Sequence, residues 1–238
     1  MSVAHRVRMA LRRLGIDVTR FPQPAADYRQ ARLLAHHRVS VVLDVGANEG
    51  QYACHLREDR FKGRIVSFEP LVEPWRRLAE RARGDSDWET VRCALGTEDA
   101  EITMNVAANA GQSSSVLPML PAHIEAAPDA RYVGTETVTQ RRLDDVVPDY
   151  LRPGDRTFLK IDVQGYEGSV LGGAPNLLDQ VIGVQLEMSL TPLYEGGLLF
   201  REALDFLTDR GFELESIEPG FSNSAGRLLQ VDGTFFRP

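Results

Sequence analysis

The sequence predicts an α/β protein with a doubly wound, mostly parallel sheet, and three observations lead to this fold class. Short apolar runs alternate with helical stretches along most of the chain. The first strong run, Val41–Val45, is almost continuously apolar, as is typical of a central strand covered on both faces. The last two runs flank a Gly/Ser/Asn-rich turn and predict a hairpin. We therefore expect helices on both faces of the sheet and an antiparallel strand from the C-terminal hairpin.

Length and composition favour one globular unit with a helical appendage. The chain has 238 residues, of which 43% are hydrophobic, enough for one sizeable core. We place the appendage at residues 1–39 and the main domain at 40–238. The net charge of -7 argues against a nucleic-acid partner, because such binding needs a clustered basic surface. No stretch of eighteen apolar residues could span a membrane, and arginines interrupt the N-terminus where a signal peptide would be apolar.

The two cysteines are better explained as thiols than as a disulfide. Cys54 and Cys93 belong to no CxxC or Cys/His ligand pattern, and a single disulfide is the alternative reading. Buried thiols and the missing signal peptide together predict a cytoplasmic protein.

The expected elements follow in order from the N-terminus. Residues 3–14 form an amphipathic helix rather than a basic arm, and a second helix, 26–38, follows the break at 21–24. These two helices either pack on the domain or cover a second copy in a homodimer. Further helices follow Gly50, Pro74 and Gly165, and another spans about 198–210. The strands after the first are expected at 64–68, 88–93, 101–106, 136–141, 157–161, 181–187, 213–217 and 228–235.

A glycine turn follows the first strand, in the string DVGANEG that starts at Asp44. A glycine after a buried strand lets the backbone approach a ligand, and the second glycine opens a helix that presents free amides. The GxxxG spacing differs from the dinucleotide fingerprint GxGxxG, and Asp44 would repel phosphate and suit a cation. S-adenosylmethionine, with its sulfonium and ammonium groups, therefore fits better than NAD. We assign four residues of this turn to the cofactor site: Asp44, Gly46, Asn48 and Gly50.

An acidic residue ends the second strand, in the string SFEP. Glu69 lies about twenty residues past the glycine turn, where a carboxylate can accept hydrogen bonds from both ribose hydroxyls. Pro70, the next residue, can cover one face of an adenine. Taken alone, Glu69 could equally interact with a helix dipole. After the glycine turn, the ribose role is favoured.

Two more carboxylates end apolar strands: Asp162, in KIDVQGYEG, and Glu187, in VQLEMS. The carboxyl ends of parallel strands meet at one edge of a sheet, so both should lie near the reacting centre. An acid there is costly unless it is paired or functional, although Asp162 could instead cap a helix. We expect Asp162 or Glu187 to be the general base, with Asp162 preferred and His123, in the irregular 111–140 insertion, as the alternative. This insertion should cover the pocket as a lid, and acceptor contacts are expected from Tyr166, Glu167 and Tyr194.

Over roughly residues 40–215 the chain resembles the FkbM family of S-adenosylmethionine-dependent O-methyltransferases. The strings that carry the resemblance are VVLDVGANEGQY, IVSFEP, RCALGT, GQSSSV, RRLDDVV, FLKIDVQGYEGSVLGGA and VQLEMS, with DVGAN and KIDVQGYE the most specific. The resemblance implies a class I methyltransferase (Rossmann-like) fold with a seven-stranded, mostly parallel sheet. It also implies that Ala94 faces the adenine, that Ser114 lies in a small polar turn near the cofactor, and that Asp162 lies beside the reacting centre.

The predicted function is transfer of a methyl group from S-adenosylmethionine to a hydroxyl of a sugar or saccharide-containing small molecule or oligosaccharide. The alternatives are a polyketide-type hydroxyl or an amine as acceptor, a non-catalytic relative that only binds the cofactor, and an NAD(P)-dependent oxidoreductase. Gln164 stands where the family commonly has Glu. This change removes a candidate acid, base or metal ligand. It argues against a required divalent metal such as Mg²⁺, for which Asp162 and Glu187 would be the ligands.

Overall fold

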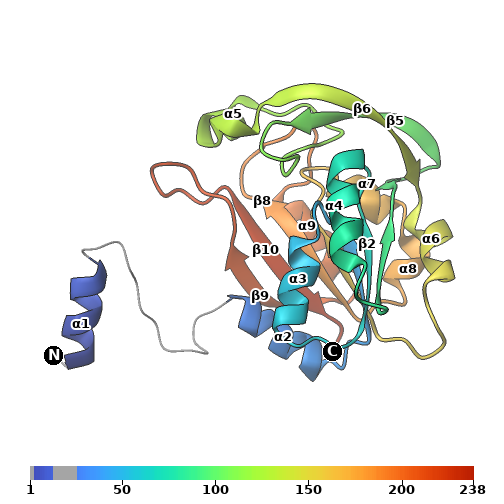
Figure 1. The fold of residues 1–238 in the computed structure, drawn as a ribbon, viewed down its shortest axis with the longest axis horizontal. Helices are drawn as coiled ribbons and strands as arrows, with labels where there is room; N and C mark the ends of the chain where they lie inside the picture. The colour runs from blue at the N-terminus through green and yellow to red at the C-terminus, as the bar shows by residue number, and fades with distance from the viewer. Residues whose placement is uncertain (1–2, 13–25) are drawn as a thin grey trace.

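The computed structural model describes residues 3–12 and 26–238 (Figure 1). Two helices come first, α1 (Val3–Arg12) and α2 (Ala26–His36), close to the expected ranges. The predicted chain break at 21–24 and the end of the first predicted helix lie outside the described residues. Both cysteines are unpaired, as predicted. Within the described ranges, no helix combines the length and the apolar character needed to cross a membrane.

A seven-stranded sheet forms the centre of the molecule, in the order β3-β2-β1-β7-β8-β10-β9. The strands are β1 (Val41–Val45), β2 (Arg64–Phe68), β3 (Trp88–Val91), β7 (Thr157–Ile161), β8 (Gly183–Ser189), β9 (Glu213–Pro219) and β10 (Gln230–Phe236). The strands from β3 to β8 are parallel, and β10 is antiparallel to both β8 and β9. The predicted sheet and its C-terminal antiparallel hairpin are therefore confirmed. The strand order reverses at the β1–β7 pair, the point where open α/β sheets bind ligands.

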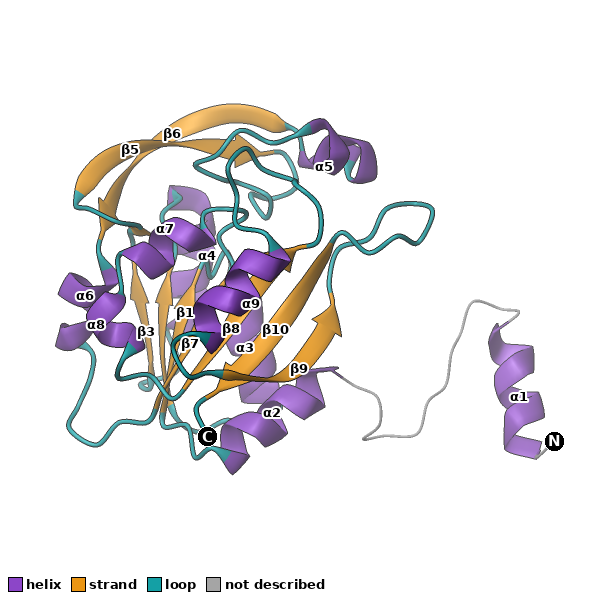
Figure 2. Ribbon diagram, turned by 180° about the vertical axis from the view of Figure 1, so that it is seen from behind, coloured by secondary structure: helices purple, strands orange, loops and turns teal. Residues whose placement is uncertain are grey.

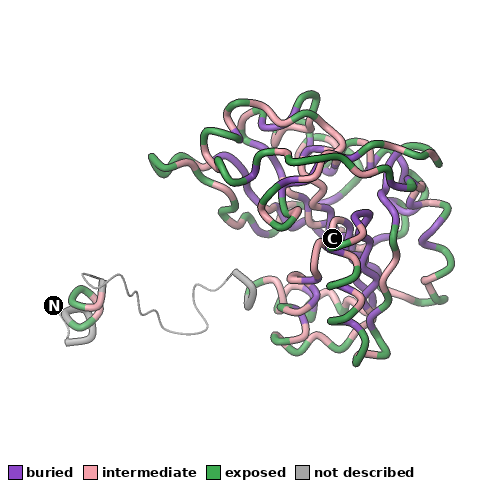
Figure 3. Tube along the Cα trace, turned by 45° about the horizontal axis from the view of Figure 1, so that its top comes forward, coloured by how far each residue is buried: buried purple, intermediate pink, exposed green. Residues whose placement is uncertain are grey.

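Helices cover both faces of this sheet (Figure 2). On one face lie α2, α3 (Gln51–Glu58) and α4 (Val72–Ala82). On the other lie α6 (Leu143–Val146), α7 (Glu167–Gly172), α8 (Pro175–Leu178) and α9 (Phe200–Thr208). Buried positions gather along the central strands, between the two layers of helices (Figure 3). Leu34 of α2 is only 1% exposed and packs in one cluster with residues of α3 and α4. The domain boundary at residue 39 stays a prediction.

The 111–140 insertion and its neighbours form a second layer above the carboxyl ends of the strands (Figure 1). A three-stranded sheet, in the order β4-β6-β5, arches there, and α5 (Pro121–Ala126) lies beside it. Its strands are β4 (Ala94–Leu95), β5 (Ala100–Ala107) and β6 (Tyr132–Arg141). The two longer strands were predicted, whereas α5 was not. Two one-turn 3₁₀ helices complete the fold, Pro128–Ala130 and Val147–Asp149.

Candidate active site

The glycine turn after β1 needs left-handed backbone at every second residue. Gly46, Asn48 and Gly50 have φ values of 76°, 47° and 86°, which glycine adopts without strain and Asn tolerates better than most residues. A Cβ on Gly46 would lie 1.8 Å from the carbonyl oxygen of Asp162. This close approach brings the turn after β1 against the turn after β7. The two sequence motifs therefore meet at the switch point of the sheet.

Glu69 connects the glycine turn to the end of β2. Its carboxylate accepts hydrogen bonds from the backbone N–H of Asn48 (2.9 Å) and of Leu71 (2.9 Å). The side chain is 5% exposed, and burial raises its pKa to about 7 despite these two hydrogen bonds. A carboxylate has about four lone-pair sites, so Glu69 keeps acceptor capacity for ribose hydroxyls.

A buried ion pair joins β1 to β7. Asp44 and Lys160 are neighbours in the parallel ladder, so their side chains share one face of the sheet. The Lys160 Nζ lies 3.1 Å from Asp44 Oδ1 and 3.7 Å from Asp162 Oδ2, and it donates to the carbonyl of Gly46 (3.2 Å). Ser67 Oγ donates to the other oxygen of Asp44 (3.1 Å). Nearby carboxylates hold the pKa of Lys160 above its ordinary value, so this side chain is an ammonium.

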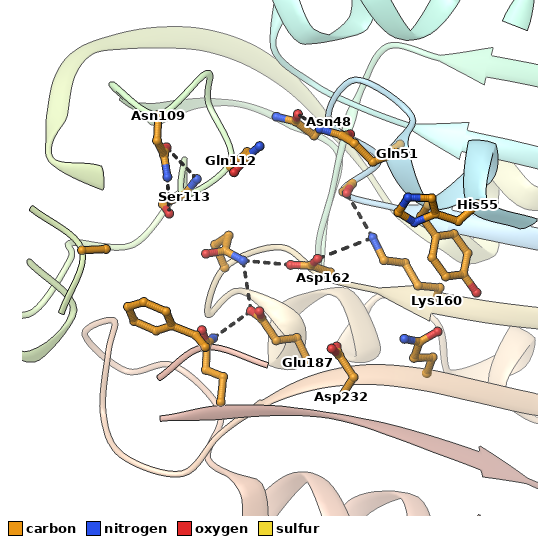
Figure 4. Close-up of a pocket in the computed structure, with 18 of the residues that line it drawn as sticks. Asn48, Gln51, His55, Asn109, Gln112, Ser113, Lys160, Asp162, Glu187 and Asp232 are labelled. Carbon is orange, nitrogen blue, oxygen red and sulfur yellow. Dashed lines mark hydrogen bonds and ion pairs between the residues drawn. The ribbon is translucent and has the colours of Figure 1, made fainter. Parts of the chain in front are cut away.

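Three carboxylates point into the same space at the ends of neighbouring strands, namely Asp162, Glu187 and Asp232 (Figure 4). Glu187 and Asp232 face each other directly in the antiparallel β8–β10 pair. Burial and the neighbouring acids raise the pKa of Glu187 well above its ordinary value, and burial raises that of Asp232 to about 6. Two side-chain amides offset the repulsion between Glu187 and the neighbouring acids. Gln164 Nε2 (3.0 Å) and Gln230 Nε2 (2.8 Å) both donate to Glu187 Oε2.

The insertion contributes the opposite wall through α5. His123 is 3% exposed and its Nε2 lies 3.2 Å from the hydroxyl of Tyr194, which itself donates to Gln164 Oε1 (2.8 Å). Burial lowers the pKa of His123, so its ring is neutral at neutral pH. The ring also packs 5.1 Å from that of Phe221, in the loop between β9 and β10. Segments distant in sequence thus meet around one small apolar cluster, which includes Leu193, Tyr194 and Leu229.

Two cavities adjoin at this edge of the sheet. The acceptor-side cavity has a volume of about 520 Å³ and lies between the carboxylates and the insertion. The cofactor-side cavity is narrower, and its lining includes Glu69 and Ala94. Five residues line both cavities: Gly46, Asn48, Gln112, Asp162 and Gln164. A single elongated ligand can therefore reach from one cavity into the other.

The structure brings most of the predicted site residues to these cavities. The cofactor-side cavity is lined by Gly46, Asn48, Glu69, Pro70, Ala94, Ser114 and Asp162. Two predicted cofactor residues line neither cavity: Asp44, which is fully buried against Lys160, and Gly50, which begins α3. Asp44 contacts Lys160 in this structure, and its predicted cofactor role stays a prediction.

The predicted acceptor contacts are distributed differently from expectation. Asp162, Glu187 and His123 line the acceptor-side cavity. Tyr166 lines the cofactor-side cavity instead, and Glu167 and Tyr194 line neither. Glu167 is 2% exposed and accepts from the backbone N–H of Val163 (3.0 Å) and Gly165 (3.1 Å). It therefore stabilises the turn after β7.

Sequence reasoning missed several residues that line the acceptor-side cavity. Lys160 and Asp232 were overlooked, although a charged residue inside an apolar strand is itself a signal of a buried partner. The amide-bearing residues give no such signal, because isolated Asn and Gln residues occur on any surface. The unpredicted lining includes Gln51, Tyr52, His55, Asn109, Gln112, Gln185, Phe221 and Gln230. In the described part of the chain, no three His, Cys, Asp or Glu residues are grouped so as to hold a metal ion.

Comparison with known proteins identifies the family of this chain. The family model described as the methyltransferase FkbM domain matches residues 44–214. A relative from Sinorhizobium fredii, named 2-O-methyltransferase NoeI, is 28% identical over 193 residues, which cover 79% of this chain and 78% of the relative.

Solved structures align with this chain at low sequence identity. An uncharacterized protein from Listeria monocytogenes serotype 4b aligns with a TM-score of 0.50 and 7% identity, over 91% of this chain and 69% of that one. Precorrin-6y C5,15-methyltransferase from Geobacter metallireducens aligns with a TM-score of 0.45 and 14% identity, over 93% and 94%. Because this family model matches residues 44–214, well over half of the chain, the chain belongs to the FkbM methyltransferase family and is an S-adenosylmethionine-dependent methyltransferase.

Proposed function

We propose that this methyltransferase transfers the methyl group to a hydroxyl of a sugar or a saccharide-containing small molecule. The observation that carries the proposal is the lining of the acceptor-side cavity. Besides Gln164, six of its side chains are primary amides: Asn48, Gln51, Asn109, Gln112, Gln185 and Gln230. An amide both donates and accepts hydrogen bonds, as a hydroxyl does, so such a wall suits a ligand that carries many hydroxyl groups.

An aromatic pair supports the same class of acceptor. The rings of His123 and Phe221 are tilted by 32° and both line the cavity. Pockets commonly combine such apolar faces with a few polar groups that fix the orientation of the ligand. A pyranose has C–H groups on one face and hydroxyls around its rim, so it can contact the rings and the amides at once. The name of the Sinorhizobium relative, a 2-O-methyltransferase, is compatible with this class.

The chain's residues fit the cofactor. Glu69 can accept the ribose hydroxyls, Pro70 and Ala94 can cover the adenine, and the turn at Gly46 leaves backbone free to approach the methionine portion. When bound, S-adenosylmethionine supplies a methyl group on a sulfonium, and its transfer to oxygen breaks the C–S bond and leaves a thioether.

The carboxylates provide the base that the acceptor needs. A sugar hydroxyl is a weak nucleophile at neutral pH, so its proton must leave as the new O–C bond forms. Asp162 is the only one of the three carboxylates that lines both cavities, which supports a position between the cofactor and the acceptor. We assign it the role of base, and Glu187 the role of its neighbour, which orients the hydroxyl. General base catalysis of this kind is typically worth about 10²- to 10⁴-fold.

Two measurements test the proposal in sequence. Calorimetry should first show that S-adenosylmethionine and its demethylated product bind the folded protein. Formation of the demethylated product is then measured with a panel of neutral glycosides and oligosaccharides, each paired with its 2-deoxy analogue, and with phenolic and amine acceptors. Turnover confined to the phenols or amines would refute the sugar assignment. Asp162→Asn should lower kcat by about 10²-fold or more, and Glu187→Gln by less. Full turnover in both variants would refute the assignment of the base.

A further inference from the structure

The side-chain amide of Gln164 has one orientation that satisfies all its neighbours. Its Nε2 lies 2.9 Å from Asp162 Oδ1 and 3.0 Å from Glu187 Oε2. A carboxyl oxygen without a proton only accepts hydrogen bonds, so the NH₂ group faces these two oxygens, with one hydrogen for each. The amide oxygen then faces Tyr194, whose hydroxyl donates to it at 2.8 Å. Every hydrogen of this amide is used.

The insertion and the loop of residues 190–199 between β8 and α9, called the 190s loop, hold Gln164 in this place. Its backbone is left-handed, with φ of 55°, a conformation that non-glycine residues keep only when their surroundings impose it. Ser115, in the insertion, donates its hydroxyl hydrogen to the carbonyl of Gln164 at 2.7 Å. Tyr194 fixes the side chain, and its hydroxyl also contacts His123 of α5 at 3.2 Å. The unusual backbone and the side chain are thus both secured by residues outside the β7 turn.

We propose that Gln164 is a positioning residue that holds the carboxylates of Asp162 and Glu187 side by side as a pair of hydrogen-bond acceptors, and that Ser115 and Tyr194 orient it for this task. The proposal rests on the proposed function, since the acceptor hydroxyl is expected at this pair. It assigns the insertion a second role. Besides forming a wall of the cavity, the insertion determines where the base lies.

The acidic groups around Glu187 explain why a hydrogen-bond donor is needed at position 164. Glu187 lies among like charges, and each of them disfavours its ionised form. The hydrogen bonds from Gln164 and Gln230 favour that form. A Glu at position 164 would replace the donor with a third carboxylate. The titratable groups that face Glu187 are Asp162 and Lys160 from β7 and its turn, Glu167 from α7, Asp232 from β10, and Tyr194 from the following loop.

The test measures the ionisation of Glu187 without any acceptor present. Glutamate labelled with ¹³C at the side-chain carboxyl is introduced, and the Glu187 resonance is assigned by its loss in Glu187→Gln. We expect the titration midpoint to rise by about one pH unit or more in Gln164→Met, because one charge-assisted hydrogen bond is lost. Tyr194→Phe should give a smaller rise, since the amide remains but is no longer oriented. Gln180→Met, at an exposed glutamine far from the site, is the matched control and should titrate like the wild type.

An unchanged midpoint in Gln164→Met would overturn the proposal. If that variant does not fold, Tyr194→Phe decides alone, and an unchanged midpoint there has the same consequence. Once a saccharide acceptor is known, the acidic limb of the pH profile of kcat should move upward with the midpoint, which a merely structural role would not produce. Because the titration needs no acceptor, a shifted midpoint without methylation of any saccharide refutes the proposed function and leaves this inference intact.

Discussion

The buried ion pair between β1 and β7 gives a quantitative test of how the site is built. Substituting Lys160 by Met leaves the charge of Asp44, which is fully buried, without its cation. Coulomb's law at an effective dielectric constant of 20 gives about 5 kcal/mol for charges separated by 3.1 Å. Asp162, whose side chain is 35% exposed, is screened by solvent and adds little. Desolvation of the ammonium offsets part of the attraction, so Lys160→Met should lower the free energy of unfolding by about 3–5 kcal/mol.

Thermal and urea unfolding followed by circular dichroism measure this loss. For a chain of this length, the expected change lowers Tm by roughly 6–20 °C. The double variant Lys160→Met with Asp44→Asn should recover most of the loss, because no unpaired buried charge remains. Lys62, the chain's other lysine, is exposed, so Lys62→Met should change stability by less than about 0.5 kcal/mol. A double variant as unstable as Lys160→Met alone would show that packing, rather than the ion pair, explains the loss.

Three further predictions follow from the same geometry. Glu69→Gln should weaken S-adenosylmethionine binding by about 10- to 100-fold in calorimetry, because charge-assisted hydrogen bonds become neutral ones. The wild-type affinity should also rise with pH as the Glu69 carboxyl, whose pKa is about 7, ionises, and a flat wild-type profile would contradict this. Gly46→Ala should abolish cofactor binding, since its Cβ would lie 1.8 Å from the carbonyl oxygen of Asp162. The control is Gly84→Ala, whose Cβ would have no atom within 4 Å, and this variant should bind the cofactor normally. Burial raises the pKa of Glu167 from 4.5 to about 7. Its contribution to the free energy of unfolding is therefore complete below about pH 4.5 and is lost as the pH rises through about 7. In Glu167→Gln, urea titrations at several pH values should show a smaller decrease of the free energy of unfolding over this range.

Much of the fold follows from local sequence patterns. The strands β1, β2 and β7 have the predicted bounds, because a buried parallel strand is an uninterrupted apolar run with a turn at each end. The strand β8 was predicted at 181–187 and is observed at Gly183–Ser189. Val181 belongs to the apolar core just before the strand, so apolar character alone placed the start too early. The six-residue helix α5 was missed because its Pro/Ala-rich sequence is too short to show a helical period, and contacts with the 190s loop stabilise it.

The sequence identifies a site residue most readily where one short motif contains the end of a strand, the turn after it and the functional side chain. Gly46 and Glu69 meet that condition, because each directly follows a strand. The partners of Gln164 do not, because Ser115 and Tyr194 reach it across 49 and 30 residues of sequence. Lys160 is an intermediate case. Its place inside an apolar strand indicates a buried partner, but only the β1–β7 register identifies that partner as Asp44.

The arrangement of charges at the cavity favours a cationic methyl donor. Lys160 neutralises Asp44 within the sheet, so the carboxylates that remain at the cavity are Asp162, Glu187 and Asp232. Of the Lys and Arg side chains in the described ranges, Lys160 alone lines either cavity. This part of the cavity therefore has an acidic lining, which favours a sulfonium over an anionic ligand. The same field opposes a phosphate or carboxylate on the acceptor. The charge of the cavity thus supports the proposed neutral, hydroxyl-rich acceptor, as its amide lining does.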